Sequence, residues 1–144
     1  MATVPHQSAA LALDAMTGRA AIAARTLYVV LLTAAPVRGT TTMATMAELT
    51  APGTNGYSRL AYGPTAPAVV TGTAAAPALT TANAADLLWS AFTVDLAPIT
   101  HLALVSAATG TVGDFVQSWD AATVRDPAIN DGIRVPAGLL SLSY

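Results

Sequence analysis

Two apolar stretches, Thr26–Thr33 (TLYVVLLT) and Ile99–Ala107 (ITHLALVSA), decide the fold class of this chain. Both are rich in aliphatic and β-branched residues, which favour strands bounded by turn signals. Thr26–Thr33 is apolar at successive positions, so both of its faces are expected to be buried. We expect the core to cover one face and a helix or another subunit to cover the other.

Further short strands are predicted around these two, at fairly regular spacing and between frequent turn signals such as APGTNG. About seven to nine short strands in this arrangement predict a mainly β fold, an antiparallel β-sandwich. Loops are expected at Val37–Ala47, Thr73–Asn83 and Arg125–Gly132. The further expected strands are Glu48–Thr50, Tyr57–Tyr62, Ala68–Thr71, Asp86–Thr93, Val112–Trp119, Ile133–Val135 and Leu139–Ser143.

One short N-terminal helix is predicted at Ala9–Thr17, because this segment contains good helix formers. Ser8 can cap its start and Gly18 can end it. Residues 1–25 are therefore expected to form an arm and helix, and residues 26–144 a β-sandwich body, as one domain overall. Because so short a helix is marginal alone, it is expected to dock on the body or on a neighbour.

Composition excludes several classes of chemistry. The 144 residues contain no Cys, which excludes a disulfide framework and thiol chemistry. All cations are Arg, so Schiff-base and Walker lysines are excluded. The net charge of −2 indicates no basic surface for nucleic acid. No apolar run is long enough to span a membrane as a helix, so we expect no membrane insertion.

Low charge is the most unusual property of the composition. Only 10% of the residues are charged, against about 25% in ordinary domains, and Leu60–Ala85 has no charged residue at all. Two explanations stay open. Part of the surface could be covered by copies of the chain or by a partner. Alternatively, a coding bias could have placed Ala and Thr at surface positions.

No catalytic, cofactor-binding or metal-binding residues are predicted. His6 lies in the expected arm, and His101 lies alone within a strand, which is more typical of a structural residue than of a metal ligand. A loop cation site near Asp126 and Asp131 and a small hydrolase built on His101 stay as weak alternatives. A structure in which His101 lies far from any acid would dismiss the hydrolase. Other acids considered for paired-carboxylate chemistry are Asp114 and Asp120.

Aromatic residues offer a second alternative, a sugar-stacking platform. Burial in the core or an interface is the favoured interpretation, since aromatic side chains carry large apolar areas. Arg59 stands between two tyrosines and suggests a cation–π or interface residue. The aromatic residues concerned are Tyr28, Tyr57, Tyr62, Trp89, Phe115 and Trp119.

The order of segments resembles a group of small tailed-phage virion proteins, described as minor tail, tail-fibre-like or head-decoration proteins. The resemblance covers most of the chain. The connections Val37–Ala47 and Arg125–Asp131 are longer than expected for that group, which leaves the attachment site open. The matching pieces are AALALDAM (9–16), LYVVLLTAAP (27–36), EL (48–49), GYSRLAY (56–62), ITHLALVSAATG (99–110) and VPAGLLSLSY (135–144).

The resemblance implies a β-sandwich without catalysis that assembles into a phage particle in the bacterial host. It implies self-association as a homo-oligomer and binding to other virion proteins, in the capsid or the tail, without a cofactor. Two functions of different classes stay beside this one. One is a carbohydrate- or receptor-binding module at a tail tip, which predicts an exposed row of Trp and Tyr. The other is the hydrolase, which predicts a cleft with convergent Asp, Ser and His101.

Overall fold

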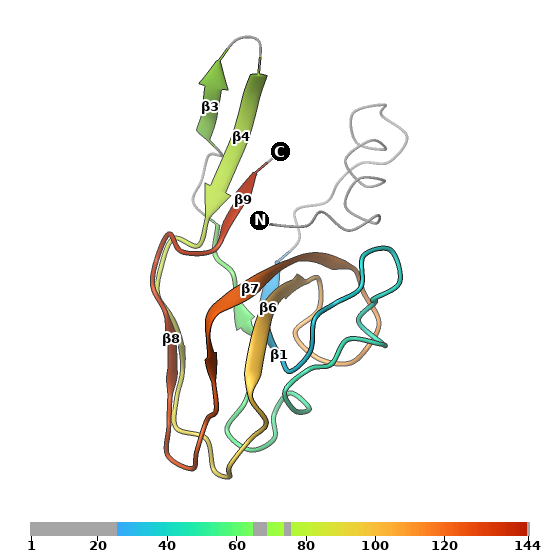
Figure 1. Ribbon diagram of the computed structural model, residues 1–144, viewed down its shortest axis with the longest axis vertical. Helices are drawn as coiled ribbons and strands as arrows, with labels where there is room; N and C mark the ends of the chain where they lie inside the picture. The colour runs from blue at the N-terminus through green and yellow to red at the C-terminus, as the bar shows by residue number, and fades with distance from the viewer. Residues whose placement is uncertain (1–25, 65–68, 74–75, 144) are drawn as a thin grey trace.

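The structure, a computed structural model, describes residues 26–64, 69–73 and 76–143, which form a mainly β fold with antiparallel sheets (Figure 1). This confirms the predicted fold class. The helix expected at Ala9–Thr17 lies outside the described residues. Within the described ranges, no helix is long and apolar enough to cross a membrane. The strands are β1 (Tyr28–Leu32), β2 (Leu60–Ala61), β3 (Val69–Thr73), β4 (Ala76–Ala82), β5 (Leu87–Trp89), β6 (Ile99–Val105), β7 (Phe115–Arg125), β8 (Ile133–Val135) and β9 (Ser141–Ser143).

The two stretches that dominate the sequence pair with each other at the centre of the main sheet. β1 and β6 are antiparallel, with Val30 opposite Ala103, and the sheet has the order β2-β1-β6-β7. β1 and β6 each have a paired strand on both sides along part of their length, which satisfies backbone N–H and C=O groups and allows their many apolar residues to be buried. Val29, Val30 and Leu104 are accordingly fully buried.

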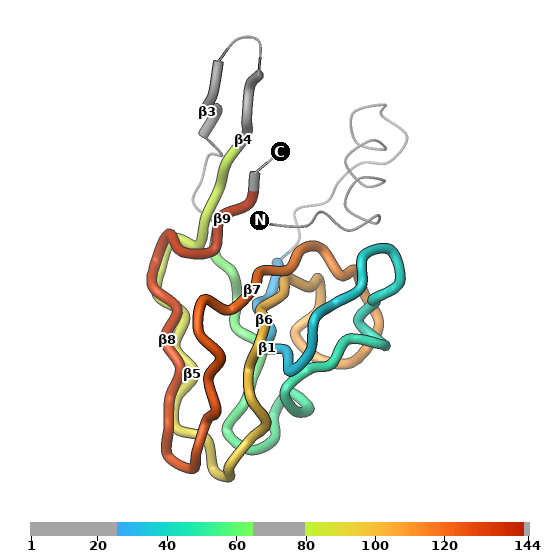
Figure 2. Tube along the Cα trace, in the orientation of Figure 1, coloured from blue at the N-terminus to red at the C-terminus, as the bar shows by residue number. Residues whose placement is uncertain are grey.

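The larger core lies between the main sheet and the two-stranded sheet of β5 and β8, which run side by side (Figure 2). Leu87 and Trp89 are buried in it, whereas Leu88 between them is 60% exposed. This alternation is typical of a strand with one buried face, and the result is a two-layer packing of antiparallel sheets. The core comprises Val29, Leu31, Leu49, Tyr57, Tyr62, Leu87, Trp89, Phe92, Ile99, Leu102, Leu104, Val135, Leu140 and Leu142.

The opposite face of the main sheet is covered by the Thr-rich segment Val37–Ala47, which was predicted as a loop. Met43 from this loop is 2% exposed and joins Val30, Leu32 and Val105 in a second apolar cluster. Both faces of β1 are therefore buried, as predicted. The cover that we expected from a helix or another subunit comes from this loop instead.

The third sheet has the order β3-β4-β9, and its β3–β4 hairpin projects from the rest of the molecule (Figure 1). β4 pairs with β3 along Ala76–Thr80 and with β9 along Thr80–Ala82. The loop predicted at Thr73–Asn83 was therefore wrong. This segment consists mainly of Ala and Thr, which carry little hydrophobic periodicity, and its partner β9 lies far away in the sequence.

Three predicted strands are much shorter than expected. The strand predicted at Asp86–Thr93 is reduced to β5, Leu87–Trp89. Glu48–Thr50 contributes only an isolated bridge between Glu48 and Leu32. Within Tyr57–Tyr62, only Leu60–Ala61 forms a strand. The rest of this segment is held by hydrogen bonds of the Tyr57 and Arg59 side chains, which take the place of regular strand pairing.

β7 is longer than predicted and continues past Trp119 to Arg125. Its pairing with β6 contains a wide bulge. Arg125 lies opposite Ile99, and Asp120 lies opposite His101, so the four residues 121–124 face a single residue of β6. A bulge of this kind twists and bends the strand locally, and it moves this part of β7 away from the regular ladder.

Candidate functional site

A buried ion pair lies beneath the turn that joins β6 to β7. The Arg59 guanidinium binds the Glu48 carboxylate through two parallel hydrogen bonds, Nε to Oε1 at 2.8 Å and Nη2 to Oε2 at 2.7 Å. The exposed fractions of the two side chains are 1% and 13%. The Tyr57 hydroxyl donates to the same Oε1 at 2.9 Å. Glu48, Tyr57 and Arg59 are called the buried polar cluster below.

The remaining contacts of Arg59 explain how a charge is tolerated at this depth. Its Nη1 donates to the carbonyl of Ala107 and its Nη2 to the carbonyl of Gly110, both at 2.9 Å. A buried charge is stable only when it is paired and its donors are satisfied. Arg59 meets both conditions and holds the β6–β7 turn against the segment before β2. The cation–π or interface role suggested from the sequence is therefore replaced by this buried ion pair.

The pKa values of two members of the buried polar cluster, Arg59 and Tyr57, are raised above their ordinary values. The hydrogen bonds that Arg59 donates to the Glu48 carboxylate, opposed in part by burial, raise the pKa of Arg59 further above its already high value. Burial, followed by the negative charge of Glu48, raises the pKa of the Tyr57 hydroxyl. A general acid or base needs a pKa near the working pH. Neither Arg59 nor Tyr57 meets this requirement, and the hydrogen bonds of Arg59 join Glu48 to the β6–β7 turn.

A second polar junction centres on Asn83, which is fully buried at the end of β4. Its Nδ2 donates to the carbonyls of Ala85 and Pro136 at 2.9 Å each. Its Oδ1 accepts from the N–H of Leu140 at 3.0 Å. One amide side chain thus joins the end of β4 to the segment that leads into β9. Within the described ranges, no buried side-chain nitrogen or oxygen lacks a hydrogen-bond partner.

Two aromatic side chains tie the same C-terminal segment to the main sheet. The rings of Tyr62 and Trp119 stack with centroids 6.5 Å apart. The Tyr62 hydroxyl donates to the carbonyl of Leu140 at 2.7 Å, and Trp119 Nε1 donates to the carbonyl of Ser141 at 3.0 Å. Burial raises the pKa of Tyr62 to about 12. These aromatic residues therefore contribute to packing and anchoring.

Four of the six aromatic residues named for a sugar-stacking platform lie in the core rather than in a row on the surface. Tyr57, Tyr62, Trp89 and Phe115 are at most 2% exposed, and Trp89 Nε1 is occupied by the carbonyl of Ser58 at 2.6 Å. The favoured interpretation, burial in the core, is confirmed for these four residues. Their ring faces are unavailable to a ligand in this conformation.

His101 does lie beside an acid, so the structure does not dismiss the hydrolase by the criterion of distance. Its Nε2 is 3.1 Å from Asp120 Oδ1, and its Nδ1 is 2.8 Å from the Thr100 hydroxyl. The Asp120 side chain is 82% exposed, whereas the orienting acid of a catalytic triad is buried. This arrangement is typical of a cross-strand pair at the edge of a sheet, which agrees with the structural role that the sequence favoured for His101 over a metal ligand.

Two of the remaining candidate acids, Asp131 and Asp114, take part in hydrogen bonds of two separate turns. Asp131 Oδ2 accepts from the N–H of Ala128 at 3.1 Å, which closes the turn between β7 and β8. The N–H of Asp114 donates to the Ser106 hydroxyl across the β6–β7 turn at 2.7 Å. In the part of the chain that the structure describes, no group of three or more His, Asp or Glu side chains could hold a metal ion.

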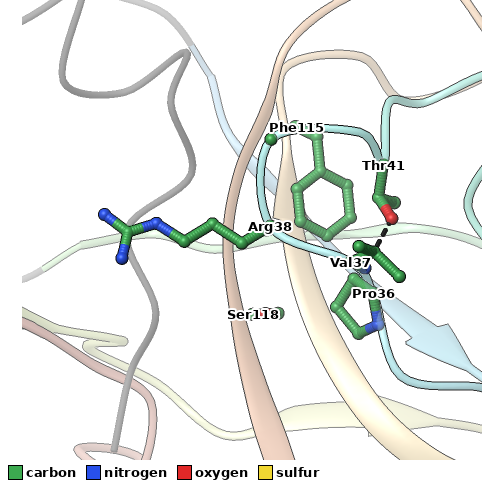
Figure 3. A pocket seen from close by; sticks show the side chains of 7 residues that line it. Pro36, Val37, Arg38, Thr41, Phe115 and Ser118 are labelled. Carbon is green, nitrogen blue, oxygen red and sulfur yellow. Dashed lines mark hydrogen bonds between the residues drawn. The ribbon is translucent and has the colours of Figure 1, made fainter.

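A shallow depression lies where the Thr-rich loop meets β7 (Figure 3). Its volume is about 20 Å³, which is room for about one water molecule. The Thr41 hydroxyl in it already accepts from the N–H of Val37 at 2.7 Å, and the Arg38 side chain points away from the Phe115 ring. The depression is therefore too small and too poor in free polar groups for a substrate. It is lined by Pro36, Val37, Arg38, Gly39, Thr41, Phe115 and Ser118.

Comparison with known proteins identifies the family. Residues 6–143 match the family model described as podophage GP4 fiber I protein gp80. The chain belongs to this family. A search of the curated proteins finds no match. The match confirms the resemblance to tailed-phage virion proteins, and the family description is that of a fibre, which supports the tail interpretation rather than capsid decoration.

Sequence reasoning missed the residues that organise this gp80-family chain. Glu48 is unusual in the sequence, because it is the single Glu among eight acidic residues. That property alone does not indicate that its partner is Arg59. Asn83 carried no signal, since it stands in an Ala- and Thr-rich segment. Its partners Pro136 and Leu140 are more than fifty residues away.

Proposed function

We propose that this chain is a non-enzymatic structural component of a podophage tail fibre, which self-associates and binds other tail proteins in the virion. The observation that carries the proposal is the family match, which extends over nearly the whole chain. The low charge of the sequence also favours a surface covered by other protein.

The polar chemistry of the described residues supports a structural rather than a catalytic role. The deeply buried polar side chains bind other segments of the chain, as Arg59 does in the buried polar cluster and as Asn83 does at the end of β4. Catalytic groups instead face a cleft with a free hydrogen-bonding position for a reacting atom. We extend the proposal to residues 1–25, which would form the arm and helix that contact a neighbouring protein.

Particles assembled without this chain test the proposal. We expect filled heads that lack a fibre and adsorb poorly to host cells, with adsorption restored when the purified chain is supplied during assembly. As a control, the surface variant Val112→Ser should restore adsorption equally well, because Val112 is 88% exposed in a turn. Particles with complete fibres and normal adsorption in the absence of the chain would contradict the proposal.

A further inference from the structure

Two of the three sheets have edges that are protected against pairing with other chains. The main sheet ends on one side with β2, which has two residues. It ends on the other with β7, which carries Asp120, Arg125 and the wide bulge. In the β5–β8 sheet, the Arg134 side chain binds the Asp86 carboxylate beside the strands at 2.6 Å. Short strands, charges and bulges are the devices that prevent edge-to-edge association.

The edge formed by β3 has none of these devices. β3 (Val69–Thr73, VVTGT) has five residues without a charge or a proline, and its register with β4 is continuous. No residue from Leu60 to Ala85 is charged. Among the described strands, β3 is paired on one side only. Because the other two sheets have protected edges, the unprotected edge of β3 indicates a site for pairing with another strand.

The position of Pro77 shows which backbone groups of β3 point outward. Pro77 lies opposite Gly72, and because proline has no N–H, this pair is expected to be a non-hydrogen-bonded one. Hydrogen-bonded and non-hydrogen-bonded pairs alternate along an antiparallel ladder. The N–H and C=O groups of Gly72 and Val70 therefore point away from β4, and those of Thr71 point toward it.

We propose that β3 pairs antiparallel with β3 of a second copy, about a two-fold axis at Thr71. Val70 then lies opposite Gly72 of the second copy, and the outward N–H and C=O groups of both residues are satisfied. Thr71 lies opposite Thr71 of the second copy in a non-hydrogen-bonded pair. Such a pairing is isologous and joins two three-stranded sheets into one.

A second copy fits this edge because the two edges are identical and neutral. Like charges opposite each other destabilise strand pairing, and a charge-free segment that pairs with itself avoids them. The three-stranded sheet would also gain the neighbours that small isolated sheets need for stability. This inference deepens the proposed function, since it names the surface through which the fibre component self-associates.

Cysteine cross-linking of the full chain tests the pairing directly, because the natural sequence contains no Cys. A non-hydrogen-bonded pair places the two Cα atoms about 4.5 Å apart, which is within the range for a disulfide. We expect oxidised Thr71→Cys to form a covalent dimer. The control Thr123→Cys, on the exposed bulge of β7, should remain uncross-linked.

A second variant separates pairing from folding. Val70→Pro removes an outward N–H without removing a hydrogen bond to β4, so Val70→Pro/Thr71→Cys should keep the far-UV circular dichroism spectrum of the folded chain and lose the cross-link. The unsubstituted chain should show a doubled mass by light scattering. A monomeric mass, or cross-linking that is equal in Thr71→Cys and Thr123→Cys, would overturn the inference. If a monomeric chain restored fibres to particles, the pairing and the self-association would be refuted, while the proposed role as a structural component of the tail fibre would stand.

Discussion

Replacing Glu48 by Gln removes the negative charge from the buried polar cluster and preserves the size of the side chain. The Arg59 guanidinium, with 1% of its side chain exposed, would keep only the two carbonyls of the β6–β7 turn as good acceptors. Breaking a buried ion pair by removing one partner costs about 3–5 kcal/mol. Because Gln retains one oxygen acceptor, we expect a loss at the lower end, about 3 kcal/mol in the free energy of unfolding.

This loss can be measured by urea unfolding and by thermal melting. For a chain of this size, each kcal/mol lowers the melting temperature by about 3 °C, so Glu48→Gln should melt roughly 10 °C below the unsubstituted chain. Asp86→Asn is the matched control, because it breaks the exposed pair between Asp86 and Arg134. Exposed pairs contribute little, so its melting temperature should change far less. Equal shifts in the two variants, or no shift in Glu48→Gln, would refute this reasoning.

Four further outcomes follow from the structure. Gly56→Ala should melt well below Gly39→Ala: both glycines have positive φ, at 77° and 81°, but only at Gly56 does an added Cβ meet a backbone oxygen, at 2.7 Å. Asn83→Ala should cost at least ~2 kcal/mol in urea unfolding, since it leaves buried backbone groups unpaired; a loss below the error of the measurement would contradict the junction. Burial raises the pKa of Tyr62 to about 12, so its contribution to the free energy of unfolding is fully present below the ordinary tyrosine pKa near 10 and is lost as the pH rises through 12. A melting temperature that stays constant from pH 9 to 12 would contradict this. His101→Ala should leave adsorption of reconstituted particles unchanged, and a complete loss of adsorption in a folded variant would show that His101 acts in binding or chemistry.

The strands with strong local signals were predictable. β1 and β6 consist mainly of aliphatic and β-branched residues and occupy the centre of the main sheet, where burial on both faces matches their composition. β8 and its preceding turn were also predicted, because Asn130, Asp131 and Gly132 favour a turn. Local chemistry and tertiary structure agree in these segments.

The segments whose secondary structure was predicted wrongly depend on contacts with residues that are distant in the sequence. β4 reads as a loop because Ala and Thr give no periodicity, and it becomes a strand only through β3 and β9. Tyr57–Tyr62 reads as a strand, yet the Arg59 side chain and the Tyr57 hydroxyl hold most of it through long-range hydrogen bonds. Tertiary context overrides local propensity in both cases.

Among the candidate functional residues too, some roles could be predicted from local sequence and others depend on distant contacts. The aromatic residues could be assigned to the core from composition, because large apolar side chains gain most from burial. The cross-strand contact of His101 with Asp120 required the register of β6 and β7, including the bulge. No pattern in the sequence gives that register, and the pairing of Glu48 with Arg59 depends on the irregular segment between them.

The central claim is that the chain is a structural component of a tail fibre. Purified particles separated into heads and tails, with the copies of this chain counted in each fraction by quantitative mass spectrometry, test it most directly. The account predicts that the chain is present on tails in a fixed, small number of copies and is absent from heads. Copies confined to heads, or absence of the chain from both fractions, would contradict it.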